Sequence, residues 1–394
     1  MEPTIKQLVL KRFRSIPSER ITFDNPTIFV GRNGSGKSNL VSAFSFLADA
    51  MASPLQAVFD KAGGISTVRN RSSGRSYPPN LGLRVDFGRL NGKAASGFYA
   101  FEVRALKNYG FSVVREQCSI GRAWFDRIGT KFTSNVGGMK PALDPASLSL
   151  PLVGGEAKFA PVLRTLAAMR VYSIEPGKLR EMQDPDSGTS LKPDGGNVTS
   201  VLKEIERQAA GDFQRISEIL ATIVPNTKRV QVKKHGKNLS LEFTQEWGER
   251  KRLKFEGFSM SDGTLRAIGL LAAVFQRPVP SLIAVEEPEA TIHPGALESV
   301  LDLLRHASKH MQVVITTHSP ELLDAKWITD SHLRIVEWTE GATRVAPVSD
   351  ATRKALHDHL MGAGELLRSS ALDPASLFDH EEKLLQGDLF EDFA

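Results

Sequence analysis

The apolar positions of the chain alternate between strand-like runs and helical stripes. An apolar run at residues 27–30 is followed by apolar residues at helical spacing, namely Leu40, Ala43, Phe44 and Leu47. Residues 281–285 and 313–317 form two further apolar runs, and the helical stripe between them comprises Leu297, Val300, Leu301 and Leu304. This strand, helix, strand order predicts a right-handed crossover, which places both strand ends at the same edge of a parallel sheet.

The middle of the chain has a different pattern. Residues 81–132 alternate β-type runs with turn residues, which predicts an antiparallel sheet. Residues 137–155 and 184–196 are rich in proline or glycine and are expected to be irregular, the second as a surface loop. Apolar residues at helical spacing then predict two helices, at 198–205 and 213–223, which we interpret as a helical insertion.

The composition is that of an ordinary folded protein. Of the 394 residues, 41% are hydrophobic and 24% are charged, which excludes a disordered or collagen-like chain. The single cysteine, Cys118, excludes an intrachain disulfide and a cysteine-based zinc site. Because no apolar run approaches the ~18 residues of a membrane helix, we expect a cytoplasmic protein with no membrane segment.

Charge is unevenly distributed along the chain. The formal net charge is +5, which permits a polyanionic partner but does not demonstrate one. Six acids and one lysine lie in residues 379–394, so the rest of the chain is more basic than the total suggests. We expect this acidic C-terminal tail to be a solvated chain end.

Basic residues are concentrated in a predicted hairpin. Residues 228–254 contain nine lysines and arginines, and two β-type runs flank a turn at 235–238. Clustered basic side chains bind the phosphates of nucleic acids, whereas a solvated hairpin is the alternative interpretation. The candidate DNA contacts are Lys233, Lys234, Lys237, Arg250 and Arg252.

The strongest motif occupies residues 31–38, which read Gly-Arg-Asn-Gly-Ser-Gly-Lys-Ser and satisfy the pattern G-x-x-x-x-G-K-[ST]. It stands between a predicted strand and a predicted helix, as a phosphate-binding loop (P-loop) requires. The glycines let backbone amides curl around phosphate oxygens, while the helix dipole adds positive potential. Lys37 supplies a positive charge and Ser38 can bind Mg²⁺, so the motif predicts a triphosphate site.

Two polar sites follow the other strand-like runs. Residues 281–285 end in the consecutive carboxylates Glu286 and Glu287, and the run at 313–317 ends in His318. Open α/β sheets bind ligands at these strand ends, so Glu286 can hold Mg²⁺ through water while Glu287 polarises an attacking water. The imidazole of His318 can hydrogen-bond a γ-phosphate. The alternatives are an exposed acidic loop and a structural histidine.

These motifs resemble the ABC-type ATPase heads of the SMC, RecF and OLD-like proteins, and most closely the stand-alone AAA-family ATPases of bacteria. The resemblance spans nearly the whole chain and includes a strand and turn at residues 8–15 ahead of Gly-x-Asn-Gly-x-Gly-Lys-Ser-Asn at 31–39. It implies an α/β P-loop NTPase of the ABC-ATPase head type. Such a head has a parallel core sheet, a flanking antiparallel β-subdomain and a helical insertion.

The resemblance also implies roles for individual residues. Catalysis is expected of Glu287 and of His318, which matches the switch histidine. Mg²⁺ is expected on Ser38 and Glu286, the latter standing where transporter-type heads carry Asp. The nucleotide-binding residues are then Arg14, Asn33, Gly34, Ser35, Gly36, Lys37, Ser38 and Asn39.

Residues 259–264 are similar to the signature loop of the family, which closes on the nucleotide of a second protomer. The resemblance therefore implies a head-to-head homodimer that forms on ATP binding. Ser261 and Gly263 stand at the positions that meet the γ-phosphate, whereas Asp262 replaces the usual glycine. A capped core helix is the alternative, because serine and aspartate are both favoured N-cap residues.

Two other family features are less well defined. Residues 290–294 resemble the loop that crosses the dimer interface, although His293 is equally well explained as a surface residue. The glutamine loop of the family has two candidates, Gln117 and Gln183, and the sequence does not choose between them.

The main hypothesis is an Mg-dependent ATPase coupled to DNA or to a separately encoded effector protein, in genome maintenance or phage defence. The alternative is a weakly hydrolysing, nucleotide-gated sensor or regulator of a separately encoded toxin or nuclease. A nuclease in its own right is a third hypothesis, and no second acidic cluster supports it. We divide the chain into a nucleotide-binding lobe with the antiparallel β-subdomain (1–165), a linker with the helical insertion and basic hairpin (166–256), and a lobe with the signature loop, carboxylates, switch histidine and tail (257–394).

Overall fold

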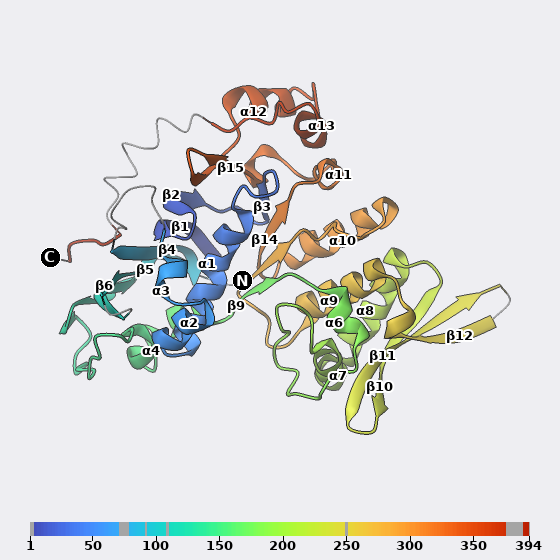
Figure 1. The fold of residues 1–394 in the computed structure, drawn as a ribbon, viewed down its shortest axis with the longest axis horizontal. Coiled ribbons are helices and arrows are strands. Elements are labelled where there is room, and N and C mark those ends of the chain that lie inside the picture. The colour runs from blue at the N-terminus through green and yellow to red at the C-terminus, as the bar shows by residue number, and fades with distance from the viewer. Residues whose placement is uncertain are drawn as a thin grey trace. The chain divides into compact units, whose positions relative to one another are not determined.

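The computed structural model describes residues 4–70, 79–90, 93–107, 110–248, 251–375 and 389–393 (Figure 1). The chain divides into two compact units. The P-loop unit contains the phosphate-binding motif and comprises Met1–Met169, Thr329–Met361 and Ser369–Ala394. The carboxylate unit contains the acidic motif and comprises Arg170–Ile328 and Gly362–Arg368.

A seven-stranded antiparallel sheet dominates the P-loop unit, in the order β2-β1-β4-β5-β6-β7-β8. Five of these strands, β4 to β8, overlap the region where the sequence predicts an antiparallel sheet, and that prediction is confirmed. The strands are β1 (Thr4–Phe13), β2 (Ile16–Thr22), β4 (Asn80–Leu90), β5 (Lys93–Ala105), β6 (Phe111–Ile120), β7 (Ala123–Ile128) and β8 (Lys131–Ser134).

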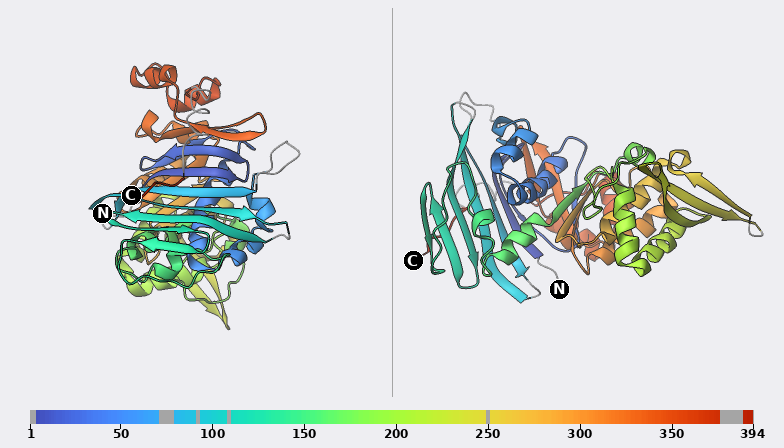
Figure 2. Two further views of the ribbon diagram at one scale, coloured as in Figure 1. Left: turned by 90° about the vertical axis from the view of Figure 1, so that its left-hand side faces the viewer. Right: turned by 90° about the horizontal axis from the view of Figure 1, so that it is seen from below.

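Helices pack on one face of this seven-stranded sheet. Helices α1 (Lys37–Ala52) and α2 (Leu55–Lys61) lie on one face, here called the inner face (Figure 2). Phe46 of α1 stacks on Phe101 of β5, with ring centroids 6.5 Å apart, and Phe59 of α2 meets the edge of Phe111 at 4.7 Å. The alternation of a pleated strand sends residues such as Arg84 to the opposite, outer face.

The P-loop unit also contains a parallel strand pair. The buried strand β3 (Thr27–Val30) runs parallel to β15 (Leu333–Thr339), which turns back into antiparallel β16 (Ala342–Ala346). The P-loop leaves the carboxyl end of β3 and enters α1, as the sequence predicts. The remaining elements of this unit are α3 (Ile65–Val68), α4 (Leu150–Val153), α5 (Ala160–Ala167), η2 (Asp330–His332) and α12 (Asp350–His357).

The carboxylate unit is built on a second parallel pair. Strand β13 (Leu282–Glu286) runs parallel to β14 (Gln312–Thr317), and α10 (Pro294–Ala307) connects them, which confirms the predicted crossover. The predicted helical pair is also confirmed, as α7 (Val198–Gln208) and α8 (Ala210–Ile223). The other elements are β9 (Met169–Tyr172), α6 (Pro176–Arg180), η1 (Gly257–Ser259), α9 (Asp262–Phe275), α11 (Pro320–Leu323) and α13 (Ala363–Arg368).

The predicted basic hairpin is confirmed and gains a third strand. Strands β10 (Thr227–His235), β11 (Asn238–Trp247) and β12 (Lys251–Glu256) form an antiparallel sheet in that order. His235 pairs with Asn238 across a tight turn in which Gly236 has a φ of 60°, a conformation that glycine adopts without strain.

The structure also bears on the single cysteine and on the expected absence of membrane segments. Burial raises the pKa of the Cys118 thiol well above its ordinary value, so this cysteine is not suited to act as a nucleophile. Within the residues that the structure describes, no helix combines the length and the apolar character that a membrane-spanning segment requires.

Candidate functional site

The P-loop is held in place by close backbone approaches that require glycine. Gly34 and Gly36 have φ values of 80° and 101°, in the left-handed region that favours glycine. A Cβ atom on Gly36 would lie 1.9 Å from the Oγ1 atom of Thr343, which is fully buried. The loop is therefore packed directly against strand β16.

The polar groups of the loop are arranged for an anion. The ammonium group of Lys37 donates to the carbonyl oxygens of Gly31 and Arg32, at 2.7 and 3.1 Å. Ser35 is buried, and its Oγ atom has no hydrogen-bond partner among the described residues. Gly36, the N-cap of α1, makes no side-chain capping hydrogen bond, and the amides and dipole of the helix start attract negative charge. A buried hydroxyl without a partner and an uncapped helix start both fit a bound phosphate.

A hydrogen-bond network joins the β1–β2 turn to the P-loop. The Oγ1 atom of Thr343 donates to the Ser35 carbonyl at 3.0 Å and shares a hydrogen bond of 2.7 Å with Ser15 Oγ. Ser15 Oγ in turn accepts from Asn39 Nδ2 at 2.8 Å, and Arg14 Nη1 donates to Asn39 Oδ1 at 3.4 Å. The structure therefore places Arg14 and Asn39, both predicted nucleotide contacts, side by side.

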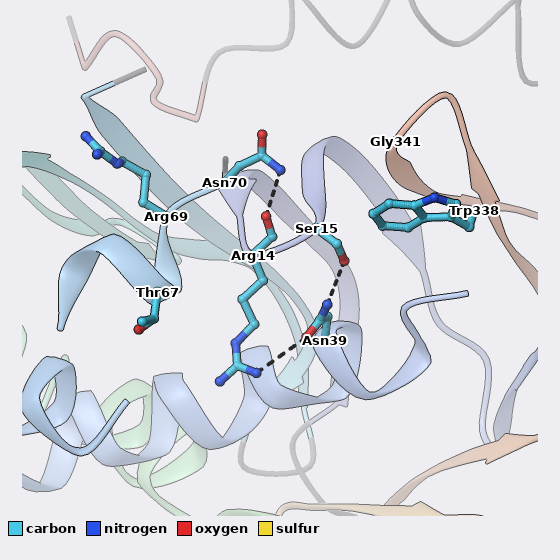
Figure 3. A pocket seen from close by; sticks show the side chains of 8 residues that line it. All are labelled: Arg14, Ser15, Asn39, Thr67, Arg69, Asn70, Trp338 and Gly341. Atoms are coloured by element: carbon cyan, nitrogen blue, oxygen red, sulfur yellow. Dashed lines mark hydrogen bonds between the residues drawn. The ribbon is translucent and has the colours of Figure 1, made fainter. Parts of the chain in front are cut away.

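A pocket of about 330 Å³ opens beside this network (Figure 3). Arg14 extends toward Asn39 between the walls of the pocket, and Trp338 lies at the opposite side. The volume falls within the range of small-molecule sites. Its lining residues are Arg14, Ser15, Asn39, Thr67, Arg69, Asn70, Trp338 and Gly341.

Sequence reasoning did not identify several of these residues. Arg69, Asn70, Trp338 and Thr343 belong to no motif, and Thr343 lies hundreds of residues from the P-loop in sequence. Asn70 is tied to the site because its Nδ2 atom donates to the Arg14 carbonyl at 2.7 Å. No local pattern in the sequence contains this information, since it depends on the pairing of distant strands.

The acidic motif lies at one edge of the parallel pair in the carboxylate unit. Glu286 ends β13 opposite Thr316 of β14, so Glu287 and His318 leave their strands at the same edge. Glu287 has a φ of 45°, which is uncommon for a residue with a side chain, and its N–H donates to the Thr316 carbonyl at 3.0 Å. Strained backbone of this kind is concentrated at functional sites.

The side chains at this edge contact one another. His318 Nδ1 lies 2.9 Å from Glu287 Oε1, and Thr317 Oγ1 donates to Glu289 Oε1 at 2.5 Å. Burial raises the pKa of the Glu289 carboxyl, and its Oε2 atom has no hydrogen-bond partner among the described residues. Arg266 of α9 donates to the Glu287 carbonyl at 3.4 Å. Arg266 is thus an additional residue of this edge that the sequence did not predict, and Glu289 is a member of the acidic motif to which the sequence assigned no role.

The signature segment begins helix α9. Ser261 is the N-cap, and its hydroxyl accepts from the Thr264 N–H at 3.3 Å, so the helix-capping interpretation is correct for this residue. A Cβ atom on Gly263 would lie 2.6 Å from the Thr291 carbonyl, which explains the need for glycine. The charge of Asp262 is paired, because its carboxylate accepts a hydrogen bond from Arg180, which also donates to the Met260 carbonyl at 3.1 Å.

The remaining candidates have structural contacts. His293 caps α10 by accepting from the Gly295 N–H at 3.1 Å. Gln183 accepts from the N–H and the hydroxyl of Thr199, at 3.0 and 2.8 Å. Gln117 lies on β6 and binds the backbone of Glu391. Both glutamines are therefore engaged within their own unit.

The basic hairpin is partly neutralised. Lys233 lies 3.1 Å from Glu256 and 3.6 Å from Glu242, and Arg252 lies 3.4 Å from Glu246. Lys234 lies on β10 and Lys237 in the turn between β10 and β11, and both are exposed. Arg250, the fifth candidate DNA contact, lies outside the described residues.

The residues present fit an Mg²⁺ site of the P-loop type. In the described part of the chain, no three His, Cys, Asp or Glu side chains lie together as a metal centre. A P-loop site does not need such a cluster, because Mg²⁺ retains several waters and takes one or two protein oxygens together with the phosphates. In the P-loop unit, the Ser38 hydroxyl in the first turn of α1 is an oxygen of this type. In the carboxylate unit, Glu286 ends β13 with a carboxylate, which is also an oxygen ligand.

Comparison with known proteins gives a consistent result. A family model described as "AAA domain, putative AbiEii toxin, Type IV TA system" matches residues 27–123 and 184–324. The matched ranges include the P-loop, the signature segment, both carboxylates and His318. The chain is also similar to Old nuclease of Escherichia phage P2, with 20% identity over 417 residues that cover 98% of this chain and 68% of that protein.

Two solved structures of SMC heads have the same fold. The head domain from Pyrococcus furiosus, with an extended coiled coil and bound to the C-terminal domain of ScpA, gives a TM-score of 0.55 at 14% identity, covering 91% of this chain and 99% of that chain. The Pyrococcus yayanosii head domain with a coiled coil and joint gives a TM-score of 0.50 at 13% sequence identity, and the match covers 91% of this chain and 100% of that chain. The predicted fold, a P-loop head of the ABC-ATPase type, is confirmed.

Proposed function

The chain belongs to the AAA-domain family named above, and from this premise we propose that it is an Mg-dependent ATPase head that works as a nucleotide-driven homodimer. It is an AAA-type ATPase relative of SMC heads and of Old nuclease. The observation that carries the proposal is the P-loop. Lys37 is already folded over the loop, and the buried Ser35 hydroxyl has no partner among the described residues.

The nucleotide is proposed to bind along the P-loop unit. Backbone amides of residues 33–38 and the Lys37 ammonium would hold the phosphates. The neighbouring pocket would receive the ribose and the base, with Trp338 offering an aromatic face and Arg14 a positive charge. Asn39 would connect the two parts of the site, because it follows the P-loop directly and contacts both Arg14 and Ser15.

The carboxylate unit is proposed to supply the hydrolytic groups. Glu287 would accept a proton from the attacking water, and His318, which is in contact with it, would orient that carboxylate and bind the γ-phosphate. Ser38 and Glu286 would hold Mg²⁺, which when bound neutralises charge that develops on the phosphates. Lys37 and Glu286 belong to different units. The statement that both residues act on the same nucleotide is therefore part of the proposal.

A second protomer is proposed to complete the site. The N-terminus of α9, with Ser261 and Gly263, would meet the γ-phosphate held by the other copy. Asp262 would repel that phosphate if its charge were unpaired, and its ion pair with Arg180 removes this objection. The Arg180–Asp262 pair therefore makes this unusual signature sequence compatible with a dimeric ATPase.

The biological output is proposed to be a shape change passed to DNA or to a separately encoded effector, in genome maintenance or phage defence. On the hairpin, Lys234 and Lys237 are the better candidates for DNA contact, because Lys233 and Arg252 already have acidic partners. A weakly hydrolysing regulator of a separate toxin or nuclease is the second candidate, which the toxin–antitoxin wording of the family description favours.

A turnover assay separates the two candidates. Phosphate release from Mg-ATP is measured with and without duplex DNA, using the wild-type chain and Lys37→Ala. An ATPase coupled to DNA releases phosphate over many cycles, more rapidly with DNA, and loses this activity in Lys37→Ala. Tight ATP binding with negligible turnover under both conditions would favour the regulator and contradict the ATPase.

A further inference from the structure

A short segment of the acidic tail lies on the outer face of the seven-stranded sheet. The tail segment, Leu389–Phe393, contacts residues of β4, β5, β6 and β7 and so passes across several strands of this face. It lies on the side of the sheet away from α1 (Figure 2). The expectation of a solvated chain end is wrong for Leu389, which is only 2% exposed, whereas Glu391 and Asp392 of the same segment are exposed.

Leu389 fills a position that the sheet leaves open by having a glycine. A Cβ atom on Gly82 of β4 would lie 2.2 Å from Leu389 Cδ1, so any larger residue would displace the leucine. The neighbouring Arg84 donates from Nη1 to the Leu389 carbonyl at 3.1 Å. Both the side chain and the backbone at this position are therefore recognised.

Glu391 is recognised by charge and through its backbone. Arg84 Nη2 lies 2.5 Å from Glu391 Oε1. Gln117 is fully buried, and its side-chain amide makes two hydrogen bonds to the Glu391 backbone: Nε2 donates to the carbonyl at 2.8 Å and Oε1 accepts from the N–H at 2.9 Å. A buried amide that pairs with a peptide unit in this way recognises an extended peptide.

Aromatic side chains make the remaining contacts between the tail segment and the sheet. The ring of Phe393 stacks on Trp124 at 4.9 Å and on Phe98 at 6.1 Å. Arg115 places its guanidinium 4.9 Å from the ring centre of Phe390 and donates to the Glu391 carbonyl at 3.3 Å. Stacking of this kind adds about 0.5–1.5 kcal/mol per aromatic pair beyond the burial of apolar area.

We propose that the outer face of this sheet is a peptide-recognition surface for an acidic, aromatic segment of the pattern Leu-Phe-Glu-x-Phe, and that its resident ligand is the tail segment of the same chain. Every hydrogen bond described above involves a side chain of the sheet, while the strands β4 to β7 pair with one another. The segment thus behaves as a ligand seated on a finished sheet. The same segment of a second copy presents the same chemistry and can replace it.

The inference is independent of the proposed ATPase function, since none of its residues belongs to the P-loop or to the acidic motif. Its test uses the full chain with its own segment disabled by Leu389→Ala and Phe393→Ala. A fluorescein-labelled peptide of residues 387–394 (Gly-Asp-Leu-Phe-Glu-Asp-Phe-Ala) is titrated with this variant and with the wild-type chain, and fluorescence anisotropy is recorded.

The disabled chain should bind the peptide at least about tenfold more tightly than the wild type. If the tail segment occupies the surface about nine-tenths of the time in the wild type, only about one-tenth of the sites are open, and the apparent affinity for the peptide is lower by about tenfold. A control peptide carrying the same two alanines should not bind. The proposal is overturned if the disabled chain, with unchanged thermal unfolding, fails to bind the peptide or binds both peptides equally.

A second full-chain variant protects the test against misfolding. If the disabled chain unfolds at a lower temperature than the wild type, the titration is repeated with Glu391→Ala, which removes the ion pair to Arg84 and leaves Leu389 and Phe393 in place. This variant should bind the labelled peptide more tightly than the wild type and less tightly than a fully vacated surface. Affinity equal to that of the wild type would contradict the proposal.

Discussion

The Nδ1 atom of His318 lies 2.9 Å from the Oε1 atom of Glu287, although the two residues follow different strands. This contact follows from the parallel pairing of β13 with β14, which brings both strand ends to one edge. A histidine that donates from Nδ1 to a carboxylate keeps Nε2 available for a second hydrogen bond. This contact supports the proposal that Glu287 is the general base and that His318 contacts the γ-phosphate.

Glu287→Gln should separate binding from chemistry. The amide can still contact His318 but cannot accept the proton of a water, so we expect ATP binding to be retained and phosphate release to fall by about 10²-fold or more. The trapped nucleotide should also stabilise a dimer, measurable by light scattering. Glu298→Gln, an exposed change on α10, is the matched control and should behave as the wild type. Unimpaired hydrolysis by Glu287→Gln would contradict the assigned role.

Two glycines of the P-loop should respond differently to alanine. Both have positive φ, so each substitution introduces strain of about 1–2 kcal/mol. Gly34→Ala adds a Cβ that meets no atom within 4 Å, whereas the Cβ of Gly36→Ala would overlap the buried Thr343 side chain. We expect ATP affinity to fall further in Gly36→Ala, with a lower midpoint of thermal unfolding. Equal behaviour of the two variants would argue against tight packing of the loop on β16.

The Arg180–Asp262 ion pair predicts that a loss of ATP turnover caused by changing Arg180 is reversed by also changing Asp262. Arg180→Ala should leave the Asp262 carboxylate facing the phosphate of the second protomer and lower ATP turnover by about tenfold, or about 1.4 kcal/mol. Adding Asp262→Ala should restore most of the loss, because the repulsion then disappears. Steady-state turnover of the wild type, both single variants and the double variant forms a double-mutant cycle. Additive losses in the double variant would show that the pair has no such role.

Stability of the hairpin should depend on pH through Glu242. A hydrogen bond from the Lys254 ammonium holds the pKa of this carboxyl below its ordinary value of 4.5. A lowered folded-state pKa means that the stabilisation is present above 4.5 and is lost as the pH falls through the folded-state value. Near neutral pH, Glu242→Gln should reduce the free energy of unfolding by about 0.2–1 kcal/mol.

The difference in the free energy of unfolding between the wild type and Glu242→Gln should become smaller as the pH falls. Chemical denaturation at a series of pH values measures this difference. The exposed change Glu298→Gln serves again as the control and should unfold as the wild type does near neutral pH. A difference that persisted unchanged at low pH would show that Glu242 acts through packing and not through its charge.

Local features of the fold were predictable from the sequence. The P-loop between β3 and α1, the crossover through α10 and the β10–β11 hairpin each depend on short-range periodicity or on turn residues. Such patterns reflect which side of an element is buried, and that information lies within a few neighbouring residues. The residues proposed for nucleotide binding and catalysis lie within these local patterns, and their roles stay predictions.

Long-range contacts were not predictable. Thr343 reaches Ser35 and Arg180 reaches Asp262 only because elements distant in sequence pack together. The tail was misjudged because its charge count outweighed its apolar residues, and Leu389 proved to be the residue that anchors it. Gln117, a candidate for sensing the nucleotide, binds the tail segment. In each case the partner is defined by tertiary packing, which a single sequence does not display.

The central claim is that the P-loop binds a nucleoside triphosphate, and calorimetric titration of the full chain with Mg-ATP tests it most directly. Each chain should bind one nucleotide, and the affinity should fall by about 100-fold, or about 2.7 kcal/mol, in Lys37→Ala. Lys309→Ala, an exposed change on the surface, should leave the affinity unaltered. No heat of binding from a folded wild-type chain, or equal affinity in Lys37→Ala, would contradict the account.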